Sequence, residues 1–136
     1  MKYLLDVNAL VALGFLQHEF HARVVGWIGA LAAKETPELA TCSITELGFV
    51  RVLAQAPQYD LEIAQARALL LRLKMAKLVN FAFISDDHDA SHIPLWVKSA
   101  KQITDGHLVQ LAKSKAAILA SLDRGIPGAF LIPPAS

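Results

Sequence analysis

The sequence has little cysteine, no long apolar run and few charged residues. One cysteine, Cys42, among 136 residues cannot form an internal disulfide or a zinc–thiolate cluster, and after an apolar segment we expect it to be a buried strand thiol. The longest nearly apolar run, residues 24–33, spans ten residues, whereas a membrane-spanning helix needs about 20. Asp6 and Asn8 interrupt the apolar N-terminal stretch, which is untypical of a signal peptide. We therefore expect a cytoplasmic protein without membrane association.

The overall composition describes a globular domain that is close to neutral. Hydrophobic residues make up 54% of the chain and charged residues 18%, a balance that excludes a disordered chain because there is ample apolar surface to bury. The net charge of +1 argues against binding nucleic acid by bulk charge alone. A chain of 136 residues is typical of one domain. We expect this domain to span residues 1–132, followed by a short tail at 133–136.

Short apolar segments alternate with longer segments of helical periodicity along the chain. We expect strands at residues 2–6, 39–42, 80–84 and 117–121, with an edge strand at 130–132. We expect helices at residues 9–16, 21–33, 43–53, 60–77, 95–100 and 104–114. This alternation predicts an α/β fold, with a parallel sheet of four to five strands and helices on both faces.

The helix expected at residues 60–77 differs from the others in being apolar on nearly all sides. Asp60 is the candidate N-cap residue. A helix of this kind is either central core or a protein-binding surface.

Four acidic residues lie where an expected strand meets a helix: Asp6, Glu46, Asp105 and Asp123. In a parallel α/β sheet, sites form at the carboxyl ends of the strands, so these acids are candidates for one shared site. Three of them also have a local structural explanation. Glu46 follows Ser43 in a capping-box pattern, Asp105 suits the dipole of a first helical turn, and Asp123 lies in an Asp-Arg-Gly turn.

Asp6 is harder to explain as a structural residue. A carboxylate that ends a buried strand loses water and needs a partner. One cause for all four acids is a bound cation, because clustered carboxylates repel one another and are the ligands that Mg²⁺ or Mn²⁺ prefers.

Four ordered motifs carry a resemblance to a known family. They are Asp-Val-Asn-Ala-Leu at 6–10, Thr-Glu-Leu-Gly-Phe-Val-Arg at 45–51, Ile-Thr-Asp-Gly-His-Leu-Val-Gln-Leu-Ala at 103–112 and Ser-Leu-Asp-Arg-Gly at 121–125. In this order and at this spacing the chain resembles PIN-domain nucleases, and more closely the VapC-type toxins of type II toxin–antitoxin systems. The resemblance covers residues 2–131. Its departures, Gly106 and Ser121, remove no acidic residue.

The resemblance implies a magnesium-dependent endoribonuclease (or a manganese-dependent one), with tRNA as a candidate substrate. It implies that Asp6 and Asp105 are direct metal ligands and that Glu46 and Asp123 complete the acidic pocket, binding a second ion or an activated water. It also implies that Asn8 and Ser121 are hydrogen-bonding groups beside these acids.

The resemblance also implies protein partners: a small cognate antitoxin and a second copy of the chain. The carboxylates themselves repel the RNA backbone, so cations near the pocket must recruit it. Arg51, beyond Glu46, and Arg124, beside Asp123, are candidate phosphate contacts. Alternatively, these two arginines pair with neighbouring acids.

Three other interpretations stay open at this point. A haloacid-dehalogenase-type phosphatase also begins with a strand that ends in aspartate, but its motif needs a second aspartate where this chain has Asn8. A PIN-like fold can also serve as a catalytically inactive RNA- or protein-binding module. Two histidine pairs, His18 with His21 and His88 with His92, have spacings compatible with zinc, but no third ligand stands at a diagnostic spacing.

Overall fold

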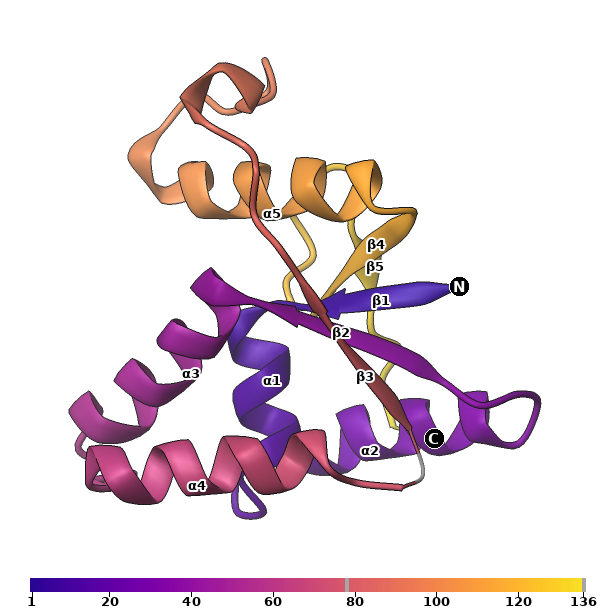
Figure 1. Cartoon of the computed structure of the whole chain (residues 1–136), viewed down its shortest axis with the longest axis vertical. Helices are drawn as coiled ribbons and strands as arrows, with labels where there is room; N and C mark the ends of the chain where they lie inside the picture. The colour runs from indigo at the N-terminus through magenta and orange to yellow at the C-terminus, as the bar shows by residue number, and fades with distance from the viewer. Residues whose placement is uncertain (78, 136) are drawn as a thin grey trace.

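A parallel sheet of five strands forms the centre of the computed structural model, which describes residues 1–77 and 79–135. Its order is β3-β2-β1-β4-β5, and every strand pair is parallel (Figure 1). The strands are β1 (Lys2–Leu5), β2 (Glu38–Cys42), β3 (Asn80–Ile84), β4 (Ala117–Ser121) and β5 (Phe130–Leu131). The predicted α/β class and parallel sheet are confirmed, and the expected edge strand at 130–132 is β5.

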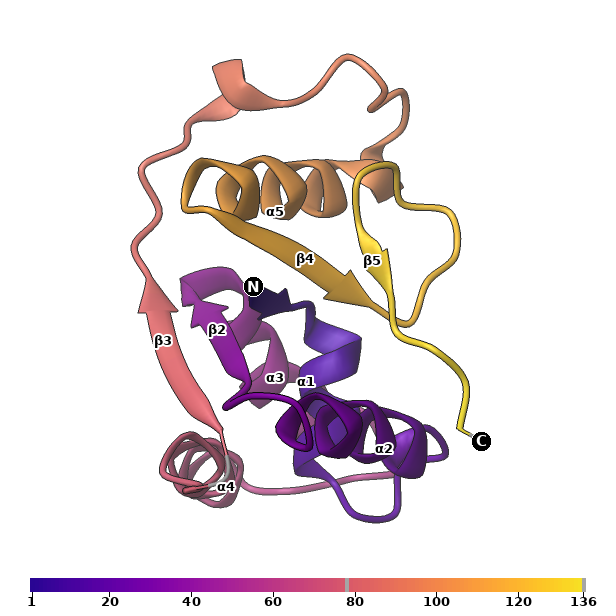
Figure 2. The same ribbon diagram turned by 90° about the vertical axis from the view of Figure 1, so that its right-hand side faces the viewer.

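Helices cover both faces of this sheet, as the sequence predicts. The helices on one face are α1 (Val7–Gly14), α2 (His21–Ala32), α3 (Ser43–Gln55) and α4 (Ile63–Lys74), whereas α5 (Ile103–Ser114) lies on the other (Figures 1 and 2). The inner strands β1, β2 and β4 are buried on both sides because their side chains alternate between two cores. Leu5 packs with α1–α4, and Leu4 packs with Leu108 and its neighbours on α5.

The start of α4 differs from the prediction. Asp60 does not cap the helix, because its backbone has φ 49°, in the left-handed region. The helix begins instead at Ile63, where Glu62 is the N-cap residue and Gln65 accepts a 2.9 Å hydrogen bond from the Glu62 amide. It ends at Lys74 rather than residue 77. Only Ala66 and Leu70 are buried along it, so α4 is not a central core helix.

The prediction of a helix at residues 95–100 is wrong. Two short 3₁₀ helices lie on either side of this segment, η1 (Ala90–His92) and η2 (Ala100–Gln102). The segment itself begins with a turn in which the Val97 amide donates to the Pro94 carbonyl at 3.1 Å. The Gln102 side chain then accepts from the Lys98 amide at 2.7 Å, so that local side-chain bonds replace helical ones.

Two close contacts explain glycines at particular helix positions. A Cβ atom on Gly48 would lie 2.5 Å from Val7 Cγ2, so this glycine allows α3 to approach α1. A Cβ atom on Gly106 would lie 2.5 Å from Val97 Cγ2. Gly106 therefore lets the segment before α5 pack directly on that helix, which gives a structural reason for glycine where the family pattern more often has a larger residue.

The remaining features of the core agree with the sequence. Cys42 is fully buried in β2, as expected of a strand thiol. Within the described ranges, the helices are too short or too polar to cross a bilayer. The expected tail at 133–136 includes Ser136, which lies outside the described residues.

Candidate active site

The carboxyl edge of the sheet collects the acidic residues. β1 and β4 are paired with Leu5 opposite Ala120, so both strands end at the same level. Asp6 directly follows β1, and Asp123 lies two residues beyond β4. Glu46 lies in the first turn of α3, directly after β2, and Asp105 lies in the first turn of α5. The topology thus brings residues from four parts of the sequence to one edge.

Asp6 is buried and also caps the first helix. Its Oδ1 atom accepts a 2.8 Å hydrogen bond from the Ala9 amide, which caps α1. Burial raises the pKa of Asp6 to about 6, and the charges of Asp123 and Asp105 act in the same direction. Hydrogen bonds from the Ser121 side chain and the Ala9 amide lower the pKa but do not cancel the effect of burial.

Asp105 and Asp123 lie close enough to Asp6 for their charges to raise its pKa. Burial raises the pKa of Asp105, and the charge of Asp123 raises it further. Asp123 is exposed, and its amide donates a 3.0 Å hydrogen bond to Ser121 Oγ. Ser121 is fully buried and contacts both Asp6 and Asp123. The three aspartates therefore form a group of like charges, in which the ionised forms of Asp6 and Asp105 are disfavoured.

Glu46 is held apart from this group by other partners. The capping-box interpretation is wrong, because Cys42 is the N-cap residue of α3 and Thr45 completes that cap. The Glu46 Oε2 atom instead accepts hydrogen bonds from Thr41 Oγ1 and Lys74 Nζ, each at 2.5 Å. Nothing in the sequence pattern pairs Lys74 with Glu46, because 28 residues separate them.

The donor atoms of this edge fit a hard divalent cation. Within residues 1–77 and 79–135, no group of three or more His, Cys, Asp or Glu side chains is arranged to hold one ion directly. Mg²⁺, however, is usually held by one or two carboxylates and keeps several of its waters. Asp6 and Asp105 can supply such carboxylates, and a cation beside them would offset the burial and the repulsion that together raise their pKa values.

The remaining candidate residues are exposed polar and basic side chains. Asn8 is exposed in the first turn of α1. Arg51 and Arg124 are exposed, and neither forms an ion pair with an acid in the described part of the chain. Arg51 and Arg67 line an open groove of about 680 Å³ between α3 and α4. The alternative that the two arginines merely pair with neighbouring acids finds no support in these contacts.

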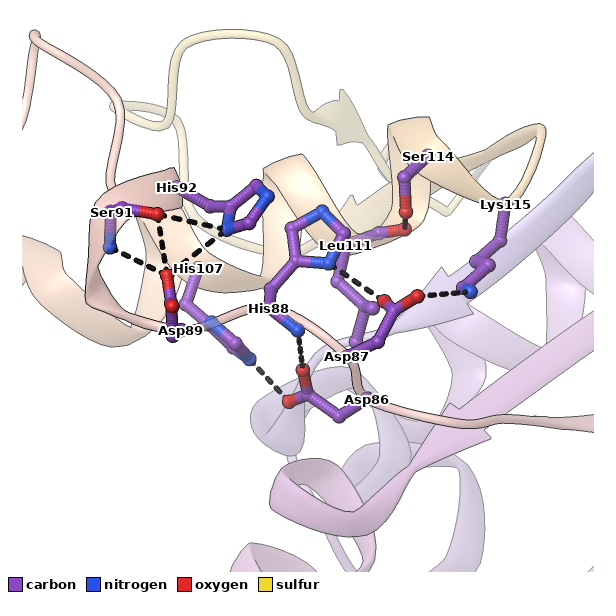
Figure 3. Close-up of polar contacts among 10 residues, drawn as sticks. All are labelled: Asp86, Asp87, His88, Asp89, Ser91, His92, His107, Leu111, Ser114 and Lys115. Atoms are coloured by element: carbon purple, nitrogen blue, oxygen red, sulfur yellow. Dashed lines mark hydrogen bonds and ion pairs between the residues drawn. The ribbon is translucent and has the colours of Figure 1, made fainter.

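The loop after β3 carries an imidazole–carboxylate network instead of a zinc site (Figure 3). The rings of His88 and His92 are 4.1 Å apart, but each has its own carboxylate partner. His88 Nδ1 lies 2.9 Å from Asp87 Oδ1, and His92 Nδ1 lies 3.3 Å from Asp89 Oδ1. The second histidine pair, His18 and His21, also has hydrogen-bond partners within the chain. His21 Nδ1 lies 2.8 Å from the Ala12 carbonyl oxygen, and His18 Nδ1 accepts from a backbone amide.

His107 connects this loop to the helix that carries Asp105. Its Nε2 atom lies 2.5 Å from Asp86 Oδ2 (Figure 3). Burial raises the pKa of Asp86, but hydrogen bonds from the His88 amide and the His107 ring outweigh this and leave it below its usual value. The sequence analysis missed this contact, and no local spacing signals it, because 21 residues separate the partners.

A parallel sheet with acids at its carboxyl edge and helices on both faces is the architecture that the motifs predict. The PIN domain family pattern matches residues 3–129. Ribonuclease VapC38 of Mycobacterium tuberculosis (strain ATCC 25618 / H37Rv) is 39% identical over 127 residues, covering 90% of this chain and 86% of the relative. Ribonuclease VapC44 of the same strain is 35% identical over 136 residues, covering 93% and 89%.

The fold is also similar to a solved structure. The crystal structure of VapBC2 from Rickettsia felis bound to a DNA fragment from their promoter matches with a TM-score of 0.62 and 14% identity. The match covers 96% of this chain and 97% of the other. The chain therefore belongs to the PIN domain family, and within it to the VapC-type toxins.

Proposed function

We propose that this chain is a toxin-type endoribonuclease that hydrolyses RNA phosphodiester bonds with the help of Mg²⁺ or Mn²⁺, with tRNA as its substrate class and the cytoplasm as its location. The relatives VapC38 and VapC44 are named ribonucleases. The observation that carries the metal dependence is the group of Asp6, Asp105 and Asp123, because burial of Asp6 and Asp105 and repulsion within the group both favour a bound cation.

In this proposal Asp6 and Asp105 hold the ion. A bound divalent ion supplies Lewis-acid chemistry, since it activates water and neutralises charge on the phosphate during in-line displacement. Ser121 fixes the Asp6 carboxylate through its side chain and accepts from the amide of Asp123. Asp123 and Glu46 complete the negative pocket.

Exposed basic and polar groups then bind the substrate. Arg51 and Arg124 form no ion pair with an acid in the described part of the chain, so their guanidinium groups can contact RNA phosphates as bidentate donors. Asn8 offers an amide at the start of α1, where it can hydrogen-bond to the ion's water shell or to the substrate.

Two protein partners belong to the same proposal: a small cognate antitoxin and a second copy of the chain. The Rickettsia felis protein of similar fold is a VapBC complex. Large apolar side chains are exposed on α3 and α4, including Leu47 at 62%, Ile63 at 62% and Leu71 at 53%. Exposed apolar side chains of this size on neighbouring helices are typical of a protein-binding surface.

The test is RNA cleavage by the purified chain with Mn²⁺ and with EDTA. Asp6→Asn keeps a good helix cap but loses the charge, so it is expected to abolish cleavage while retaining a cooperative fold. Asp60→Asn is the matched control: its backbone is in the left-handed region, which Asn tolerates, and it should cleave like the wild type. Cleavage in EDTA or by Asp6→Asn would refute the metal mechanism. RNA binding without any cleavage would favour the inactive binding module.

A further inference from the structure

One oxygen atom of Glu46, Oε2, accepts hydrogen bonds from residues of two different elements. Thr41 Oγ1, from the last part of β2, donates to Oε2 at 2.5 Å. Lys74 Nζ, from the last turn of α4, donates to the same atom at 2.5 Å. Thr41 is fully buried. Its hydroxyl therefore holds the Glu46 carboxylate in a fixed position at the carboxyl edge of the sheet.

Lys74 is itself held in place on more than one side. Its side chain is 24% exposed and that of Glu46 is 21% exposed, so the ion pair is partly shielded from water. The ammonium also lies 5.6 Å from the centre of the Phe83 ring on β3, a favourable cation–π position. The α3–α4 packing and the β3 edge therefore bring one protein cation to Glu46.

The aspartates of the same edge have no such partner. In the described part of the chain, Asp6, Asp105 and Asp123 form no ion pair with Lys, Arg or His. The edge is thus divided into an aspartate group without a counter-charge and a glutamate whose counter-charge is built in. A cation entering from solution gains most where the negative charge is uncompensated.

We propose that Lys74 is the resident counter-cation of Glu46: it fixes the position of this carboxylate at the carboxyl edge of the sheet and takes the place that a second divalent ion would otherwise occupy. This inference rests on the proposed metal-dependent function and deepens it, because it limits divalent binding to the aspartate group. Lys74 is a positioning residue that acts through Glu46.

The test counts Mn²⁺ ions bound to the folded chain without RNA, by electron paramagnetic resonance of free Mn²⁺ during titration. Lys74→Met leaves the Glu46 carboxylate uncompensated, so it is expected to bind one further Mn²⁺ per chain than the wild type. That extra site should disappear in the double variant Lys74→Met/Glu46→Gln. Lys74→Arg keeps the charge and should keep the wild-type count.

Two further variants make the outcome decisive. Lys34→Met makes the same charge change at an exposed position just after α2 and should leave the count unchanged. Glu46→Gln alone should also leave the count unchanged, whereas a Glu46 that ligates a second ion would lose one. This second variant tests the inference even if Lys74→Met does not fold.

The outcomes separate this inference from the function on which it rests. Equal counts for Lys74→Met and the wild type, an extra site that survives Glu46→Gln, or a lower count in Glu46→Gln alone would each overturn the role of Lys74. A wild type that binds no Mn²⁺ would overturn the metal-dependent function itself, and the inference with it.

Discussion

The Oδ1 atom of Asp6 accepts a 2.8 Å hydrogen bond from the Ala9 amide, so the carboxylate that faces Asp105 and Asp123 also caps α1. The cap ties the position of this acid to the first helix of the chain. An Asn at this position keeps the acceptor oxygen and removes only the charge. Substitutions at Asp6 therefore separate the electrostatic cost of the site from its structural role.

The first prediction concerns the pH dependence of the metal-free protein. The pKa of Asp6 is raised from 3.8 to about 6 in the folded chain, so the folded state binds a proton more tightly than the unfolded state. This group therefore lowers the free energy of unfolding as pH rises from about 4 to about 6, by about 3 kcal/mol in all. Urea unfolding in EDTA at pH 4.5 and 7 measures the larger part of this loss, about 2 kcal/mol.

Asp6→Asn is the comparison for this prediction. Because Asn does not titrate, its free energy of unfolding should vary less between these two pH values than that of the wild type. An equal pH dependence in the two proteins would mean that Asp6 has an ordinary pKa in the fold.

The second prediction is that Asp105→Asn changes stability and function in opposite directions. Asp105 makes no side-chain cap bond in α5, and Asp123 raises its pKa along with burial. Removing its charge relieves repulsion, so the variant should melt a few degrees higher than the wild type in EDTA. It should also lose RNA cleavage.

In excess Mn²⁺ the wild type should melt at a higher temperature than Asp105→Asn, the reverse of the order in EDTA. A site that binds only the folded chain adds about 2.7 kcal/mol at a hundredfold excess over the dissociation constant. The wild type should gain this stability, and Asp105→Asn should lose most of the gain. An Asp105→Asn protein that is less stable than the wild type in EDTA would show that Asp105 acts first through the helix dipole.

The third prediction concerns the close approach of α1 and α3. Gly48→Ala would place a Cβ atom 2.5 Å from Val7 Cγ2, on a β-branched side chain with little freedom to move. We expect a loss of about 1–3 kcal/mol in the free energy of unfolding. Gly29→Ala in α2 is the control, since nothing lies within 4 Å of its added Cβ atom. It should gain up to about 1 kcal/mol from helix propensity, and chemical denaturation measures both.

The fourth prediction concerns assembly. The exposed apolar side chains of α3 and α4, such as Leu47 and Ile63, are expected to be covered in a complex. Light scattering should show the purified chain as a dimer and, with the product of a small antitoxin-like neighbouring gene, as a larger complex. A strict monomer that does not bind the neighbouring product would contradict both proposed partners.

Much of the fold follows from local sequence patterns. Apolar runs of strand length alternating with helical periodicity predicted the parallel sheet and the helices on both faces, because these patterns record which side chains each element must bury. The same segments carry the motifs that identify the PIN domain family. Local signals were weakest at helix ends: Glu62 and Gln65 cap α4 although Asp60 also suits a cap.

The candidate site was also predictable in part from local sequence. The positions of Asp6, Glu46, Asp105 and Asp123 at strand–helix junctions were readable from the sequence, because the carboxyl ends of parallel strands share one edge. Their roles as metal ligands stay a prediction. The sequence did not show that Glu46 differs from the three aspartates in having a cation of its own.

Only the tertiary structure decided the pairings that distinguish one acid from another. Lys74 reaches Glu46 across 28 residues, and His107 reaches Asp86 across 21. Periodicity and capping patterns report on neighbours within one or two helical turns. The partners of a charged side chain beyond that range depend on how helices pack against each other and against the sheet, here α4 on α3 and α5 over the loop after β3. Local sequence determined where the acids lie, and long-range packing determined which of them is neutralised.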